Sequence, residues 1–236
     1  MAIVTGASGG IGKAIALRLA HDGAAVVVHF HRREQQAEQL AESIRSGGGS
    51  AVALRADMGL VGEARRLIGD AVQRFGRLDI LVNNAGKFSP KPFAETTEED
   101  FDAVINLHAK GPYFAMQEAA RVLADNGRIV NISTAGTRMN FHGASAYLAS
   151  KRALEQLTKG IAQELAGRGI TVNVVAPGIT DSGVLTDPYR QLGLDRSPMR
   201  RVGQPADIAD VIAFLVSEEA RWVTGQTIQV GGDIVM

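Results

Sequence analysis

Short apolar runs rich in β-branched residues alternate along the chain with longer segments whose apolar residues recur at helical spacing. We expect strands at residues 3–4, 26–28, 51–56, 80–82, 128–132, 171–175 and 228–230. Between them we expect helices at residues 11–21, 34–45, 62–75, 98–123, 147–165 and 206–216. This regular exchange of strand and helix indicates an α/β protein.

The expected strands are almost entirely apolar, which is typical of a parallel sheet that is buried on both faces. Strands joined through helices cross over in the right-handed sense, so that helices cover both faces of the sheet. The sequence therefore predicts a doubly wound, seven-stranded parallel sheet of the Rossmann type. No change in composition marks a linker, so we expect a single domain over residues 1–236. The long irregular stretch at about 179–205 predicts a substrate lid, because long loops in compact domains are usually functional.

The composition is that of a globular chain with a large core, because 45% of the residues are hydrophobic and 21% are charged. Lys plus Arg is 25 and Asp plus Glu is 25, so the formal net charge is zero and no nucleic-acid partner is expected. The sequence has no cysteine, which excludes disulfides and thiolate metal sites, and we expect no metal. No apolar run approaches the ~20 residues that cross a bilayer, so no membrane association is expected. No charged leader precedes the first strand, and we expect a cytoplasmic protein without a signal peptide, whose N-terminus is short or trimmed.

A glycine-rich loop follows the first expected strand and leads into a helix, in the segment Thr5-Gly6-Ala7-Ser8-Gly9-Gly10-Ile11-Gly12. Gly6 can take the tight turn, and the missing side chains of Gly10 and Gly12 let backbone approach a pyrophosphate or the next strand. The free N–H groups and the dipole of the helix start favour an anion. We predict a dinucleotide-phosphate site here, with Ser8 and Ile11 among its residues; a purely structural corner is the alternative.

The second expected strand ends in a basic cluster, at the place where an Asp or Glu would hold the ribose of NAD. His31, Arg32 and Arg33 stand there, and the first carboxylate is Glu34 at the start of the next helix. An arginine at this place accommodates the 2′-phosphate of NADP(H). We therefore predict NADP(H) over NAD(H), with Arg32 as the phosphate contact and a further hydroxyl from Ser8. The alternative is that the arginines form a solvated helix start.

The third expected strand ends close to Asp57, whose carboxylate would face the same crevice. It can accept a hydrogen bond from the adenine amino group. Because Asp is also favoured as a helix N-cap, a capping role is the alternative.

Tyr147 and Lys151 are four residues apart, about one helical turn, so that both side chains can lie on one helix face. A fixed cation beside a phenol favours the phenolate and lowers its pKa. Tyr147 is therefore a candidate proton donor or acceptor. A half-buried tyrosine beside a solvated lysine is the alternative.

Two further strand ends carry polar residues, in Asn83-Asn84-Ala85-Gly86 and in Asn131-Ile132-Ser133-Thr134-Ala135-Gly136. Asn106 lies in the middle of an expected helix, which is unfavourable for Asn unless its amide is used. Together with the glycine-rich loop and the Tyr147/Lys151 pair, these segments resemble the short-chain dehydrogenase/reductase family over essentially the whole chain. The motifs TGxxxGxG, NNAG, Ser and YxxxK are those of its single-domain subgroup, and the chain is similar to 3-oxoacyl-[acyl-carrier-protein] reductases.

The resemblance implies a catalytic tetrad of Asn106, Ser133, Tyr147 and Lys151. Tyr147 would be the general acid in ketone reduction, and Ser133 would polarise the substrate carbonyl. Lys151 would lower the pKa of Tyr147 and hold the nicotinamide ribose, while Asn106 would hold a water in a proton relay.

The serine assignment has an open alternative, because Ser133 and Thr134 are adjacent hydroxyls. Ser133 is fourteen residues before Tyr147 and Thr134 is thirteen, and both spacings look possible in the family. The glycine three residues after Ser133 favours Ser133, and Thr134 remains the alternative.

The resemblance also implies a set of cofactor contacts. Asn83 would brace the strands, and the other contacts would come from Asp57, Met58, Asn84, Ala85, Gly86, Pro177, Gly178, Ile179 and Ser182, besides Tyr147 and Lys151.

We therefore expect an NADP(H)-dependent reductase of a ketone, such as a 3-oxoacyl thioester, a polyketide or a related small-molecule or carrier-bound carbonyl. An alcohol dehydrogenase working in the oxidative direction and an NADP-sensing protein without turnover are the alternatives. The lid residues suit an apolar or aromatic carbonyl, although they could simply pack the loop: Val184, Leu185, Tyr189, Leu192, Leu194 and Met199. Phe88, Phe141 and His142 are candidates for the pocket mouth.

Arg200 and Arg201 could attract an acidic carrier, but Arg201 begins a segment that resembles a common helix start of the family, which favours a structural role. The resemblance further implies a homotetramer or homodimer that pairs through the helices near Asn106 and Tyr147.

Overall fold

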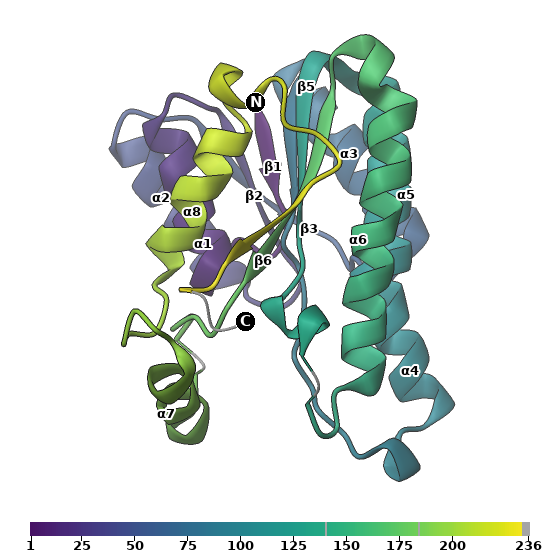
Figure 1. Cartoon of the computed structure of the whole chain (residues 1–236). Coiled ribbons are helices and arrows are strands. Elements are labelled where there is room, and N and C mark those ends of the chain that lie inside the picture. Colours follow the sequence, from purple (N-terminus) through teal and green to yellow (C-terminus); the bar gives the residue numbers. More distant parts are fainter. Residues whose placement is uncertain (140, 184, 233–236) are drawn as a thin grey trace.

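The computed structural model describes residues 1–139, 141–183 and 185–232 (Figure 1). Within them, parallel strands form one seven-stranded sheet in the order β3-β2-β1-β4-β5-β6-β7. The strands are β1 (Ala2–Val4), β2 (Val26–Phe30), β3 (Ala51–Arg55), β4 (Leu78–Asn83), β5 (Leu123–Ile132), β6 (Thr171–Pro177) and β7 (Thr227–Val230). The predicted doubly wound α/β sheet is confirmed.

Helices cover both faces of the sheet (Figure 1). The first face carries α1 (Gly10–His21), α2 (Glu34–Ser46) and α8 (Pro205–Leu215). The second carries α3 (Val61–Phe75), α5 (Gly111–Val122) and α6 (Ser145–Leu165), with α4 (Glu98–Ile105) extending from α5. Short 3-10 turns occur at Phe93–Glu95, Ala135–Arg138, Ala166–Arg168 and Glu218–Ala220. No helix among the described residues is both long and apolar enough to cross a membrane.

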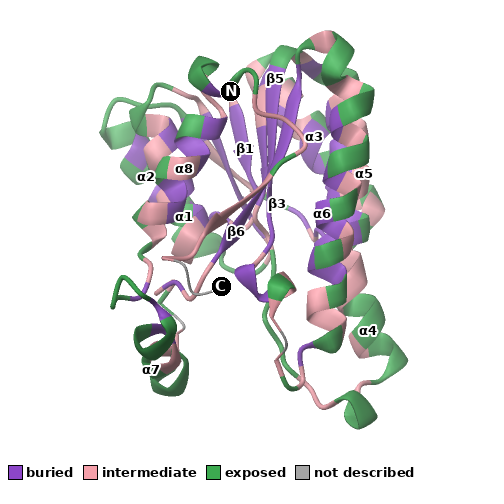
Figure 2. Cartoon of the chain, in the orientation of Figure 1, coloured by how far each residue is buried: buried purple, intermediate pink, exposed green. Residues whose placement is uncertain are grey.

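Each face of the sheet forms its own apolar core, and the strands between the two edge strands, β3 and β7, are largely buried (Figure 2). Along β2, successive side chains point to opposite faces, so Val26 and Val28 belong to one core and Val27 to the other. All five residues of β2 are buried. This two-sided burial explains why the strands read as continuous apolar runs.

The helix expected at 98–123 is interrupted, which corrects the sequence-based prediction. A π-helical turn at Asn106–Lys110 separates α4 from α5, and the N–H of Gly111 donates to the carbonyl of Asn106. Pro112 in the first turn of α5 has no N–H to continue an α-helical ladder back to His108. The wider π-helical turn accommodates the loss of this hydrogen bond, and Asn106 is its first residue.

The lid expected at 179–205 is not wholly irregular, because it contains α7 (Asp187–Arg196). Pro188 lies in the first turn of this helix, and Arg190 within the helix pairs at 2.6 Å with Asp181, which precedes it. Arg201 pairs with Asp207 at 2.6 Å in the first turn of α8, which confirms its structural role. Val184, one of the expected lid contacts, lies outside the described residues.

The sheet order reverses between β1 and β4, which are neighbours although two strands separate them in sequence. At such a switch point the connections from the strand ends diverge to opposite faces and leave a crevice at the carboxyl edge. The loops that follow β1, β4 and β5 all start at this edge, and they carry the candidate site.

Candidate active site

The glycine-rich loop after β1 has the backbone that a phosphate-binding turn needs. Gly6 and Gly10 have φ values of 64° and 54°, in the left-handed region that favours glycine. A Cβ at Gly12 would overlap the carbonyl of Gly6, so the helix start packs directly on the loop. The first turn of α1 has no acidic residue and no side-chain cap, which leaves its N–H groups available to an anion. Ser8 lies half-buried in this loop, and Ile11 packs against the first core.

Asn84 and Thr5 fix the glycine-rich loop to the end of β4. The Nδ2 of Asn84 donates to the carbonyl of Thr5 at 2.8 Å. In return, the Oγ1 of Thr5 accepts from the backbone N–H groups of Asn84 and Ala85, both at 2.9 Å. The side chain of Asn84 is therefore committed to the loop that it was expected to border. The expected bracing by Asn83 is confirmed, because its Nδ2 donates to the Oδ1 of Asn131 on β5 at 2.8 Å.

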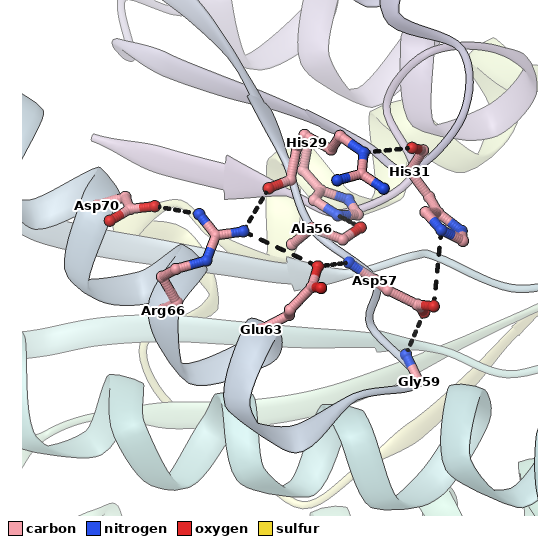
Figure 3. Close-up of polar contacts among 9 residues, drawn as sticks. His29, His31, Ala56, Asp57, Gly59, Glu63, Arg66 and Asp70 are labelled. Atoms are coloured by element: carbon pink, nitrogen blue, oxygen red, sulfur yellow. Dashed lines mark hydrogen bonds and ion pairs between the residues drawn. The ribbon is translucent and has the colours of Figure 1, made fainter.

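Asp57 lies at the far end of the crevice, in a turn after β3 (Figure 3). Its Oδ1 accepts from the N–H of Gly59 at 2.9 Å, and its Oδ2 lies 3.6 Å from the Nε2 of His31. Helix α3 has Leu60 as its N-cap, so the capping alternative for Asp57 is excluded. The carboxylate stays two-thirds covered at the crevice edge beside His31.

Met58, expected beside the adenine, is only 2% exposed and belongs to the second core. Its side chain packs in the core, and the expected place of Met58 beside the adenine stays a prediction.

The basic cluster after β2 places Arg33, rather than Arg32, over the glycine-rich loop. A Cβ on Gly9 would lie 3.2 Å from the Nη1 of Arg33, whereas Arg32 has no atom within 4 Å of that position. Arg33 is the residue just before α2, and its guanidinium reaches back over the crevice. The preference for Arg32 is therefore not supported by the geometry.

The start of the lid folds back onto the phosphate loop. A Cβ on Gly10 would lie 3.1 Å from both the Cβ and the carbonyl oxygen of Ser182, so Ser182 lies against the glycine-rich loop. Pro177 ends β6 in the buried interior, and the N–H of Gly178 donates to the carbonyl of Val230 at 3.0 Å. Ile179 then lines a cavity of about 440 Å³ between the lid, β7 and Ala135.

Tyr147 and Lys151 lie in α6, and both are largely withdrawn from water. Burial raises the pKa of Tyr147 to about 12, and a hydrogen bond from the Thr134 side chain opposes that rise. The Nζ of Lys151 donates to the carbonyl of Ile132 at 2.7 Å, and burial lowers its pKa to about 8. Lys151 was expected to depress the pKa of Tyr147, but the net shift of Tyr147 is upward because burial dominates. Gly86 borders this lysine, since a Cβ there would lie 3.5 Å from the Nζ.

Ser133 is turned away from Tyr147 into a buried polar cluster. Its hydroxyl donates to the Oε1 of Glu155 at 2.7 Å, and the hydroxyl of Thr137 donates to the same oxygen at 2.7 Å. Arg152 pairs with the other carboxylate oxygen at 2.7 Å. Of the two adjacent hydroxyls, the structure brings Thr134 to Tyr147 and keeps Ser133 on Glu155.

Comparisons with known proteins agree with this geometry. A family profile described as Enoyl-(Acyl carrier protein) reductase matches residues 6–232. The chain is 39% identical over 240 residues to the 3-oxoacyl-[acyl-carrier-protein] reductase FabG of Staphylococcus aureus, with 100% of this chain and 98% of the relative covered. It is 42% identical over 240 residues to an uncharacterized oxidoreductase of Methylorubrum extorquens, with 99% and 97% covered. The crystal structure of the angucycline C-6 ketoreductase LanV with bound NADP superposes with a TM-score of 0.93 at 42% identity, covering 98% of this chain and 93% of that one.

The chain belongs to the short-chain dehydrogenase/reductase family. It is accordingly an oxidoreductase that acts on CH–OH and C=O groups. The resemblance seen in the sequence motifs is thereby confirmed over the full length.

Two buried histidines of this short-chain dehydrogenase/reductase were missed by sequence reasoning. The Nδ1 of His29 accepts from the N–H of Gly6 at 2.9 Å, so its Nε2 carries the proton and donates to the carbonyl of Ala56 at 3.0 Å (Figure 3). His29 thus ties the glycine-rich loop to the end of β3. Burial lowers its pKa to about 4, so the ring is neutral at physiological pH. A lone histidine in an otherwise apolar strand was the available signal.

His108 has the corresponding role at the reacting end of the short-chain dehydrogenase/reductase. Its Nε2 accepts from the N–H of Lys87 at 3.0 Å, which leaves Nδ1 protonated and donating to the Oγ of Ser150 at 3.1 Å. Ser150 in turn donates to the carbonyl of Tyr147 at 2.6 Å, and the imidazole packs edge-to-face on the Tyr147 ring. Burial, helped by the charge of Lys151, lowers the pKa of His108 to about 3.

Proposed function

We propose that this short-chain dehydrogenase/reductase uses NADPH to reduce a ketone to a secondary alcohol, with Tyr147 as the proton donor. The observation that carries the proposal is the half-buried Tyr147, whose hydroxyl lies close to that of Thr134 and has its pKa raised to about 12 by burial. A phenol with that pKa stays protonated at neutral pH, which suits donation to an alkoxide.

The residues fit a bound nicotinamide dinucleotide, because the first turn of α1 has no side-chain cap and no acidic residue, which leaves its N–H groups open to a pyrophosphate. That cofactor, when bound, supplies the hydride. Negative charge then builds on the substrate oxygen, where the hydroxyls of Thr134 and Tyr147 can donate hydrogen bonds. Tyr147 completes the reaction by passing its proton to that oxygen. We assign carbonyl polarisation to Thr134, because the Ser133 hydroxyl is held by Glu155.

Lys151 and Asn106 are assigned supporting roles in the same proposal. The ammonium of Lys151, held on the carbonyl of Ile132, stabilises the phenolate that remains after Tyr147 gives up its proton, and it binds the nicotinamide ribose. Asn106 starts the π-helical turn that contains His108, and it would hold a water on the way from Lys151 to solvent.

A preference for NADP(H) is supported by charge at the end of β2. Arg33 faces the glycine-rich loop, and His31 stands beside it with no carboxylate in the strand end itself. A guanidinium there pairs with a 2′-phosphate, whereas an Asp or Glu would repel it. LanV, which shares 42% of its sequence with this chain, binds NADP in its crystal structure. We propose Arg33 as the main 2′-phosphate contact, with Asp57 and the Asn84–Gly86 segment bordering the rest of the cofactor.

The substrate class is proposed from the relatives. One relative is named for 3-oxoacyl carrier-protein reduction and another for ketone reduction on an angucycline. The cavity of about 440 Å³ beside Ala135 is lined by residues of the lid and β7 rather than by Tyr147, so it does not define the substrate. We propose a polyketide-like or related ketone, with a 3-oxoacyl thioester as the other candidate.

The test is oxidation of NADPH by the purified protein in the presence of a panel of carbonyl compounds. The panel contains an aromatic ketone (α-tetralone), an acetoacetyl thioester and a crotonyl thioester, which reports reduction of a C=C bond. We expect turnover of at least one ketone with NADPH, weaker turnover with NADH, and none of the crotonyl compound. Ketone turnover absent with both cofactors would refute the proposal.

The matched variants Arg33→Ser and Arg32→Ser test the cofactor assignment. We expect Arg33→Ser to raise the KM for NADPH by about tenfold or more without changing that for NADH, since one charge-assisted contact is removed. Arg32→Ser should leave both values nearly unchanged. The opposite pattern would assign the phosphate to Arg32.

A further inference from the structure

Phe88 connects the catalytic helix to the lid. It lies in the loop between β4 and α4, with 45% of its surface exposed. Its ring centroid is 5.0 Å from that of Tyr147 at an interplanar angle of 73°, and 5.9 Å from that of Tyr189 in α7 at 85°. Both contacts are edge-to-face, which is the favoured geometry for aromatic pairs. Segments far apart in the sequence thus meet at a row of three rings that ends on Tyr147.

The backbone holds Phe88 in this place from both sides. The N–H of the preceding residue, Lys87, donates to His108 at 3.0 Å, and the N–H of Lys91 donates to the carbonyl of Gly143 at 2.7 Å. These bonds join the loop to the π-helical turn and to the segment that leads into α6. The exposed ring of Phe88 is therefore a fixed feature of the crevice wall.

Tyr189 is placed by the lid in a similar way. The neighbouring Arg190 pairs with Asp181 at 2.6 Å, which fixes α7 against the start of the lid. Arg201, at the other end of the lid, is paired with Asp207. Each of these two lid arginines is thus paired with a carboxylate of the chain itself, and the ring of Tyr189 in α7 meets that of Phe88.

We propose that Phe88 and Tyr189 form an aromatic clamp that selects ketones fused to or bearing a planar ring over linear acyl chains. This inference rests on the proposed function and names its substrate class. A planar ring can stack on or meet the edge of both aromatic side chains while its carbonyl lies at Tyr147. A linear acyl chain has no ring to make these contacts. It also loses the rotational freedom of its single bonds on binding.

The test compares α-tetralone with the N-acetylcysteamine thioester of acetoacetate, using Phe88→Leu and Tyr189→Leu, which keep apolar bulk but remove a ring. Each change should lower kcat/KM for α-tetralone by about threefold to tenfold, mainly through KM. The value for the thioester should stay within about twofold. The matched control is Phe93→Leu, which removes a ring from the same loop at a position that is 84% exposed, and it should change neither value.

The outcomes separate the clamp from the proposed function. The decisive variant is a Phe88→Leu protein that binds NADPH normally. If its kcat/KM falls equally for both substrates, or does not fall for α-tetralone, the clamp is overturned and the proposed function is not. A wild-type protein that turns over both substrates but prefers the linear thioester would also overturn the clamp. A wild-type protein that oxidises NADPH with neither ketone would overturn the proposed function itself.

Discussion

At the scale of single residues, two adjacent hydroxyls at the end of β5 have different partners. Ser133 is 4% exposed and donates to Glu155, whereas Thr134 continues the extended backbone with its hydroxyl close to that of Tyr147. Successive side chains of an extended segment point to opposite sides, so the two hydroxyls cannot exchange roles. Spacing along the sequence could not separate them, because it does not show which side of the strand faces α6.

Variants of these two residues test the assignment. Thr134→Val removes the hydroxyl at constant shape and should lower kcat by about 100-fold, because a hydrogen-bond donor to the developing oxyanion is lost. Thr134→Ser should restore most of that rate. Ser133→Ala should cost stability through Glu155 and affect kcat much less. A large loss of kcat in Ser133→Ala, together with an active Thr134→Val, would return the role to Ser133.

The pKa of Lys151 predicts the alkaline limb of the pH profile. With a pKa of about 8, Lys151 loses its charge as the pH rises through that value, while Tyr147 with a pKa of about 12 stays protonated. The cation that stabilises the Tyr147 phenolate is then lost, so kcat/KM for reduction should be flat below pH 8 and fall above it. Lys151→Arg keeps the positive charge at alkaline pH. The activity that this variant retains should therefore show no fall of kcat/KM above pH 8. A wild-type profile that is flat up to about pH 10 would contradict this account.

At the scale of elements, the break between α4 and α5 shows what periodicity alone missed. The apolar pattern runs through residues 98–123 without a gap, but Pro112 cannot donate to the carbonyl of His108. The proline was the available signal for the π-helical turn. Similarly, α7 was not predicted because Gly193 is its one buried residue, so no apolar face marks the helix.

The π-helical turn makes a prediction at Gly111. A Cβ there would overlap the carbonyl oxygen of Met58, which is backbone and cannot move aside cheaply. Gly111→Ala should therefore lower the free energy of unfolding by about 3 kcal/mol or more, as measured by urea denaturation. The matched control is Gly69→Ala in α3, where a Cβ meets nothing within 4 Å and should stabilise by about 0.5–1 kcal/mol. A neutral Gly111→Ala would contradict the close approach of α5 to the turn after β3.

At the scale of the whole molecule, the sheet was predictable because most strands are buried apolar runs and helical segments alternate with them. The seven strands expected from the apolar runs are all present, and β2 begins where it was expected. The contacts inside the crevice were less predictable. Arg32 and Arg33 look alike in sequence, and only the turn into α2 decides which of them reaches Gly9. A cytoplasmic location and a homotetramer or homodimer formed through the helices near Asn106 and Tyr147 stay predictions.

The two buried histidines predict how stability depends on pH. Their ordinary pKa is 6.5, and burial lowers it to about 4 for His29 and about 3 for His108. Between pH 6.5 and about 4 the unfolded chain therefore binds more protons, so stability falls as the pH falls through this window. The expected slope is about 1.4 kcal/mol per pH unit for each histidine, measured by urea denaturation. The slope should shrink in His29→Gln and His108→Gln, and equal stability of the wild type at pH 7 and pH 5 would contradict it.

The central claim is that Tyr147 gives the proton to the substrate oxygen, and single-turnover reduction of a ketone by Tyr147→Phe tests it most directly. The variant lacks one hydroxyl and keeps the ring that packs against Phe88 and His108. We predict that NADPH binds with unchanged affinity, while the rate of NADPH oxidation at saturating substrate falls by about 100-fold or more. A Tyr147→Phe protein that reduces the ketone at nearly the wild-type rate would contradict the account.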